Sequence, residues 1–127
     1  MPVIVRDHPD FEQSTLRNAP VVDFKAISDA HRAGDKVAAE VLARLVRNWS
    51  ICVVNLIHAY DPEIVVFSGG LMKSHDLILG PMRDYIAANA WVPSGMPELR
   101  IAADSDLSVL MGLDYLINHP EYEARRP

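Results

Sequence analysis

Two adjacent glycines, Gly69 and Gly70, follow a short apolar run and a single serine in this chain of 127 residues. The run Ile64–Phe67 has no polar alternation, which is typical of a parallel strand that is buried on both faces. In open α/β sheets, ligands bind in the crevice beyond the carboxyl ends of such strands. Glycine allows positive φ and lets an anionic ligand approach the backbone amides closely. The segment therefore predicts either a phosphate-type binding site or a plain turn between a strand and a helix.

The histidines of the chain offer a second kind of chemistry. Their spacing is not typical of a metal site, and we expect four of them to lie on the solvated surface: His8, His31, His75 and His119. The fifth, His58, lies near the end of a predicted helix, where its side chain can hydrogen-bond the last carbonyl groups. A catalytic role for His58 is the alternative.

Three other side-chain types have a structural interpretation beside a functional one. The single cysteine, Cys52, excludes an internal disulfide framework and a zinc site built from several cysteines, and its apolar neighbours indicate a small core side chain. Asp104 and Asp106 flank a predicted helix start, where capping accounts for at least one of them and a phosphate-side acid is the alternative. Asn55 is predicted to be a buried amide with a structural partner, with ligand contact as the alternative.

Composition and charge restrict the class of protein. Half of the residues are apolar (50%) and 23% are charged, as in an ordinary globular domain. A formal net charge of −5 argues against a surface that binds nucleic acid. No secretory signal opens the chain, and its longest uncharged stretch, 48–60, is too short to span a bilayer. We therefore expect a cytoplasmic protein without membrane or nucleic-acid partners.

The amino-terminal part of the chain must position a long helix. We expect a very short strand at 3–5 and an irregular arm over 6–22, which contains two prolines. Asp23 caps a short predicted helix, and Asp35 caps a much longer one that runs to about Tyr60. The carboxyl-terminal half of the long helix is apolar almost all round, which predicts that it ends in the protein interior.

The remaining elements surround the two glycines. A helical pattern covers 74–90, and Gly80-Pro81 predicts a kink or a break within it. A second strand is expected at 99–103, followed by a last helix that Asp104 or Ser105 caps. Two strands joined by a crossover helix form a right-handed parallel pair.

Several of these segments resemble one protein family. The stretch 54–70, with its helix end, Asp61-Pro62, apolar strand and glycine pair in that order, is similar to the carboxyl-terminal part of the ROK family. This family comprises bacterial sugar kinases and related repressors. The segment 33–38 matches the family's helix–Gly-Asp–helix junction, and Met111-Gly112 lies where the family has a closing helix of small residues. Ser68 departs from the pattern, because the family usually has a glycine at this position.

The resemblance implies an α/β fold, namely the carboxyl-terminal part of an actin-like ATPase (ribonuclease H-like) lobe. Its elements would follow the order helix, helix, strand, helix, strand, helix, with a small parallel sheet. Accordingly, we expect an irregular amino-terminal arm at 1–22, a ROK-like subdomain at 23–118 and a flexible tail at 119–127.

The resemblance also implies a ligand. In such kinases the glycine segment lies against ATP, and we transfer this role to Gly69 and Gly70 and, by extension, to their neighbours Ser68 and Leu71. ATP with Mg²⁺ is therefore the expected cofactor, and no zinc is expected, because the family's cysteine cluster has no counterpart here. The family's phosphate loop and catalytic aspartate have none either, so no residue receives a catalytic role and enzymatic activity is left open.

Three hypotheses follow for function. The first is a truncated or partial ROK-type sugar kinase that carries the nucleotide side of the site and is inactive alone. The second is the effector-binding and oligomerisation part of a ROK-type transcriptional regulator, and the third is a small α/β binding module. Since two strands make a poor sheet, we expect either a homo-oligomer, such as a dimer, or a missing amino-terminal half, with a nucleotide or a sugar as the bound small molecule.

Overall fold

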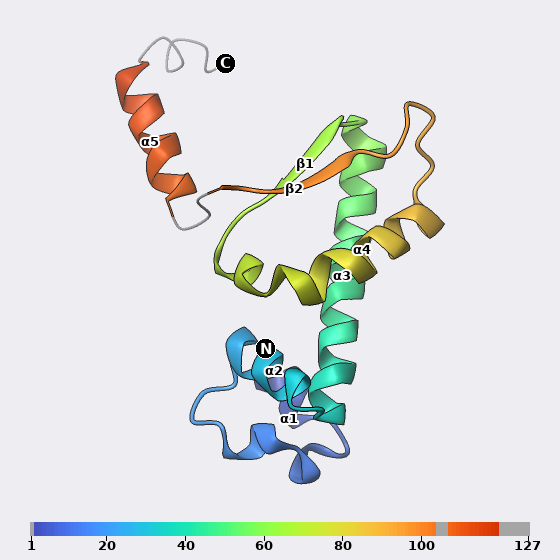
Figure 1. Ribbon diagram of the computed structural model, residues 1–127, viewed down its shortest axis with the longest axis vertical. Coiled ribbons are helices and arrows are strands. Elements are labelled where there is room, and N and C mark those ends of the chain that lie inside the picture. Colours follow the sequence, from blue (N-terminus) through green and yellow to red (C-terminus); the bar gives the residue numbers. More distant parts are fainter. Residues whose placement is uncertain (1, 104–106, 120–127) are drawn as a thin grey trace.

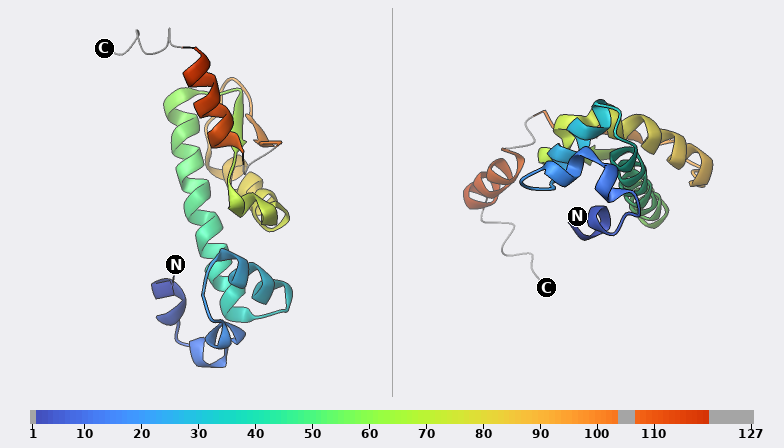
Figure 2. Two further views of the ribbon diagram at one scale, coloured as in Figure 1. Left: turned by 90° about the vertical axis from the view of Figure 1, so that its left-hand side faces the viewer. Right: turned by 90° about the horizontal axis from the view of Figure 1, so that it is seen from below.

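The long helix α3 runs along the length of the molecule, and most other elements lie beside it (Figure 1). The computed structural model describes residues 2–103 and 107–119. The short elements near the amino terminus gather around the first half of α3, and the two strands and α4 lie beside its second half (Figures 1 and 2). In chain order the elements are α1 (Pro2–Arg6), the 3₁₀ helices η1 (Phe11–Gln13) and η2 (Thr15–Asn18), α2 (Phe24–Arg32), α3 (Lys36–Tyr60), β1 (Ile64–Phe67), the 3₁₀ helix η3 (Gly70–Ser74), α4 (His75–Asn89), β2 (Glu98–Ile101) and α5 (Ser108–Asn118).

The expected strand at 3–5 is wrong, because this segment forms part of the helix α1. A strand there would need a partner for its backbone groups, whereas a helix pairs them locally, as when the Asp7 amide donates to the Val3 carbonyl at 3.0 Å. Helix α1 places Val5 in the core. The segment 6–22 is not irregular throughout either, since η1 and η2 lie within it and Leu16 is buried.

The predicted helix starts are confirmed. The Asp23 carboxylate accepts a hydrogen bond from the Ala26 amide at 2.8 Å at the start of α2. The Asp35 carboxylate does the same for the Ala38 amide at 3.0 Å at the start of α3. Of the two capping residues, only Asp35 lies at the turn between α2 and α3, directly after Gly34, which adopts φ 86°.

The carboxyl-terminal half of α3 does not end in the interior. Leu56 is 49% exposed and Tyr60 76% exposed, although Val53 and Ile57 in the same half of the helix are buried. Two further predictions in this half are also wrong, because Cys52 and Asn55 are both exposed. The sequence is apolar around the helix, but neighbouring elements cover only one of its faces.

The two strands form a parallel pair, as predicted, with Ile64 beside Glu98 and Phe67 beside Ile101. However, β1 is not buried on both faces. Val65 and Phe67 pack against the core, whereas Val66 on the other face is 61% exposed. An apolar run without alternation therefore occurs here in a sheet with one covered face, because no other described element lies over the second face.

Helix α4 is continuous over His75–Asn89 and contains Pro81, so the alternative of a break into two helices is wrong. Its buried side chains join α3 in the core, which includes Ile57, Ile78, Met82 and Ile86. The predicted capping residues of the last helix, Asp104 and Ser105, lie outside the described residues, as do Asp106 and most of the predicted tail. Within the described ranges, no helix is both long and apolar enough to cross a membrane.

Candidate functional site

The turn after β1 has two glycines with different backbone roles. Gly69 adopts φ 99° and ψ 170°, a conformation that disfavours every residue with a side chain, whereas Gly70 begins η3 without positive φ. The Met72 amide donates to the Gly69 carbonyl at 3.0 Å and thereby closes the first turn of η3. A Cβ atom placed on either glycine meets no other atom within 4 Å, so both backbone units face open space.

This open space continues into a cleft of about 620 Å³ between η3 and helix α2. The η3 wall contains Gly70 and Leu71, which were predicted to bind a nucleotide, and the α2 wall brings residues from 38 or more positions earlier in the chain. The lining residues are Asp23, Phe24, Lys25, Asp29, Arg32, Gly70, Leu71, Lys73 and Ser74.

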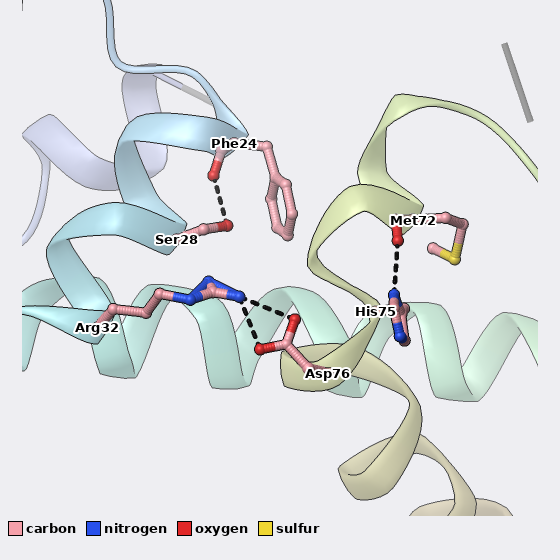
Figure 3. A network of polar contacts seen from close by, with 6 residues as sticks. All are labelled: Phe24, Ser28, Arg32, Met72, His75 and Asp76. Carbon is pink, nitrogen blue, oxygen red and sulfur yellow. Dashed lines mark hydrogen bonds and ion pairs between the residues drawn. The ribbon is translucent and has the colours of Figure 1, made fainter.

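The cleft carries charges of both signs that are held in ion pairs. The Lys25 ammonium contacts Asp29 at 2.6 Å within α2, and this hydrogen bond raises the pKa of Lys25. The Arg32 Nη2 atom donates to both carboxylate oxygens of Asp76, at 2.8 and 2.6 Å (Figure 3). The bond from Arg32 likewise lowers the pKa of the Asp76 carboxyl.

The α2 wall of the cleft also contains Phe24, whose side chain belongs to the core and is 9% exposed. The Phe24 ring packs against Trp49, with the ring centroids 5.7 Å apart and the ring planes tilted by 59°. The Ser28 hydroxyl donates to the Phe24 carbonyl at 2.8 Å (Figure 3). A cleft with cationic groups and open backbone units suits an anionic ligand.

The structure brings only some of the predicted site residues together. Gly70 and Leu71 line the cleft, Gly69 forms its adjoining turn, and Ser68 is exposed and does not line it. His58 does not hydrogen-bond the last carbonyls of α3; instead its Nε2 atom accepts a hydrogen bond from the Trp91 amide at 2.9 Å.

Sequence reasoning missed the cleft residues that α2 supplies. Asp23 was interpreted only as a helix cap, and Lys25, Asp29 and Arg32 were not considered. Their spacing of four and three positions places them along one side of a helix, which was the available signal. The closeness of that side to η3 depends on the turn between α2 and α3 and could not be recognised from spacing.

A second hollow, of about 390 Å³, lies between α3 and α4 and is mostly apolar. It is lined in part by Leu42, Val46 and Pro81, and it does not include the glycine turn. In the parts of the chain that are described, no group of three or more His, Cys, Asp or Glu side chains is arranged to hold a metal ion. The cleft beside the glycines is therefore the better candidate for the functional site.

Comparison with known proteins agrees with the arrangement of strand, glycine turn and helices. The sequence model of the ROK family matches residues 9–119. This chain belongs to the ROK family. Its match extends over both walls of the cleft, from α2 through η3 and α4.

Among the relatives of this ROK family member are two glucokinases. The chain is 34% identical to the Thermotoga maritima glucokinase over 64 residues, which are 50% of this chain and 20% of that protein. It is 29% identical to the Halalkalibacterium halodurans glucokinase over 103 residues, which are 80% of this chain and 31% of that protein. The ROK chain thus spans about a fifth to a third of the length of these relatives.

A solved structure supports the fold. The crystal structure of a candidate sugar kinase from Cytophaga hutchinsonii superposes with a TM-score of 0.73 at 19% sequence identity. The match covers 91% of this ROK chain and 38% of that protein. The predicted actin-like ATPase fold, with its small parallel sheet, is therefore confirmed.

Proposed function

We propose that this chain forms the nucleotide side of an ATP-dependent sugar kinase site, with ATP bound in the cleft between α2 and η3. One observation carries the proposal: Gly70 and Leu71 line a cleft with charged and aromatic side chains, in a chain whose relatives include glucokinases. Gly69 shapes the turn beside them, and Ser68 precedes it. Mg²⁺ would accompany the phosphates of ATP, as expected for this family.

The residues of the cleft supply binding rather than bond breaking. Phosphoryl transfer depends on positioning the reacting groups and on stabilising charge. The backbone at Gly70 and the cations Lys25 and Lys73 suit a polyphosphate. A phosphate loop and a catalytic aspartate have no counterpart in this sequence, so we propose that the chain alone binds ATP without turnover.

A thermal shift experiment with ATP–Mg²⁺ tests this proposal. At a free ligand concentration of 100 times Kd, binding should stabilise the folded chain by about 2.7 kcal/mol. The variant Gly70→Val should fold normally, since its Cβ meets no atom within 4 Å, but should lose most of the shift because Gly70 lines the cleft. The absence of any shift in the original chain at millimolar ATP would contradict the proposal.

A second function is favoured by helix α5. Leu110, Leu113 and Ile117 of this helix are 60%, 51% and 78% exposed, which is typical of a surface that meets another protein. We therefore propose, as the alternative, that the chain is the effector-binding and oligomerisation part of a ROK-type regulator, acting in the cytoplasm as a homo-oligomer or with an amino-terminal half. Stabilisation by a sugar but not by ATP–Mg²⁺ would favour this alternative.

A further inference from the structure

One ion pair connects the two sides of the cleft. Arg32 is the last residue of α2, and Asp76 lies in the first turn of α4, directly after η3. The two residues are 44 positions apart in the sequence, and their side chains meet beside the cleft (Figure 3). The Lys25–Asp29 pair differs, because both of its members belong to α2.

We infer that the Arg32–Asp76 pair is a clasp that fixes the separation of the two walls of the cleft. Both residues would then be positioning residues for the ligand rather than groups that bind it directly. This inference rests on the proposed function, because the ligand it concerns is the ATP of that proposal.

Each end of the clasp is attached to its own wall. On the α2 side, the Ser28 hydroxyl donates to the Phe24 carbonyl at 2.8 Å, within the helix that Arg32 ends. On the other side, the Nδ1 atom of His75, the neighbour of Asp76, lies 3.0 Å from the carbonyl of Met72, which is a buried residue of η3. A change in the separation of Arg32 and Asp76 would therefore move η3 relative to α2 (Figure 3).

The solvent exposure of the Arg32–Asp76 ion pair determines how much it contributes to folding stability. The side chains of Arg32 and Asp76 are 43% and 53% exposed. Ion pairs at such positions add little to overall stability, since water screens them. Their larger effect is to hold a site in its binding geometry before the ligand arrives, which lowers the entropic cost of binding.

Isothermal titration of ATP–Mg²⁺ against the full chain tests the clasp. We expect Arg32→Met, Asp76→Asn and the double variant each to bind ATP about three- to fivefold more weakly, with no further loss in the double variant. Asp76→Asn is decisive, because removal of a negative charge near the cleft would by electrostatics alone strengthen the binding of an anion. Equal or tighter binding by Asp76→Asn would overturn the inference, and so would additive losses in the double variant.

A matched control is Arg100→Met. Arg100 also pairs with a carboxylate at 2.6 Å, that of Glu98, but it lies on β2 and does not line the cleft. Its substitution should leave the affinity for ATP unchanged.

Hydrogen exchange separates the clasp from the proposed function. In the free chain, the backbone amides of residues 69–76 should exchange faster in Arg32→Met and Asp76→Asn than in the original chain, and equally fast in Arg100→Met. If the original chain does not bind ATP, the proposed function fails, but faster exchange still supports the clasp. Unchanged exchange in both variants would overturn it.

Discussion

At the scale of single residues, the adjacent glycines Gly69 and Gly70 have different structural roles. The backbone requires glycine at position 69, where φ is 99°, but not at position 70. A left-handed or similar backbone conformation costs about 1–2 kcal/mol in a residue with a side chain. Position 70 lines the cleft and has space for a Cβ atom, so chain geometry does not require glycine there.

Substitution by alanine should reveal this difference. Gly69→Ala is expected to lower the free energy of unfolding by about 1–2 kcal/mol, because of its positive φ. Gly70→Ala is the control and should change stability by less than about 0.5 kcal/mol. Urea denaturation of both variants measures the effect. Equal losses would show that the conformation of Gly69 does not require glycine.

Asp35 is a second residue whose environment sets its chemistry. Its Oδ2 atom accepts hydrogen bonds from the Thr15 amide at 2.7 Å, the Thr15 hydroxyl at 2.8 Å and the Ser14 hydroxyl at 2.9 Å. Burial alone would raise the pKa of Asp35, but these bonds and the one from Ala38 outweigh it and lower the pKa to about 2. The carboxylate thus joins η2 to the start of α3.

The variant Asp35→Asn should therefore be less stable at neutral pH by about 1–3 kcal/mol, because an amide group cannot accept all of these bonds. A lowered pKa in the folded state means that the stabilisation is present above pH 3.8, the usual value, and is lost as the pH falls toward 2. The difference in unfolding free energy between Asp35→Asn and the original chain should shrink over that range. A difference that stays constant with pH would contradict the assignment.

At the scale of elements, α3 has two unlike faces in its second half. Ile57 is 2% exposed and packs with α4, whereas its neighbour Leu56 is 49% exposed. Both residues are large and apolar, so composition does not distinguish them. Their difference comes from α4 and the strands, which cover one side of the helix only.

Alanine substitutions at these neighbours form a matched pair. Ile57→Ala should cost about 2–5 kcal/mol of unfolding free energy, because it leaves a cavity in the core. Leu56→Ala should cost less than about 1 kcal/mol, since its side chain is half exposed already. Chemical denaturation of the two variants gives the comparison. A similar cost for both would mean that another chain covers Leu56 in solution.

At the scale of the whole molecule, apolar surface remains uncovered on β1 and on α5. Val66 of β1 and Ile117 of α5 are 61% and 78% exposed. Burial of apolar surface contributes roughly 25 cal/mol per Å². A second copy of the chain that covers these faces would therefore gain considerable stability.

We accordingly expect the chain to self-associate at micromolar concentration. Light scattering after gel filtration should give a mass above the 14.1 kDa of one chain. The double variant Leu110→Glu and Ile117→Glu should shift the mass toward that of a monomer, because it places charges on the exposed face of α5. A clean monomer for the original chain would contradict this expectation.

Local signals in the sequence predicted much of the fold. Asp23 and Asp35 as helix caps, the strand Ile64–Phe67 and the parallel pairing with a second strand are all confirmed. The caps and the strand depend on residues that are close in sequence, such as a carboxylate three positions before the amide that it caps, and the parallel pairing follows from the crossover helix between the strands. Membership of the ROK family rests on the same kind of local order and is confirmed as well.

Burial and the second wall of the cleft were decided by tertiary structure. An apolar side chain such as Val66 is buried only if another element covers it, and its sequence neighbours do not show whether one does. Likewise, Arg32 and Asp76 meet because the turn between α2 and α3 directs α2 toward η3. The sequence alone thus determined where α2, α3 and β1 begin and which family the chain belongs to. Only the packing of those elements decided which side chains share a site, because contacts between distant residues depend on the path of the whole chain.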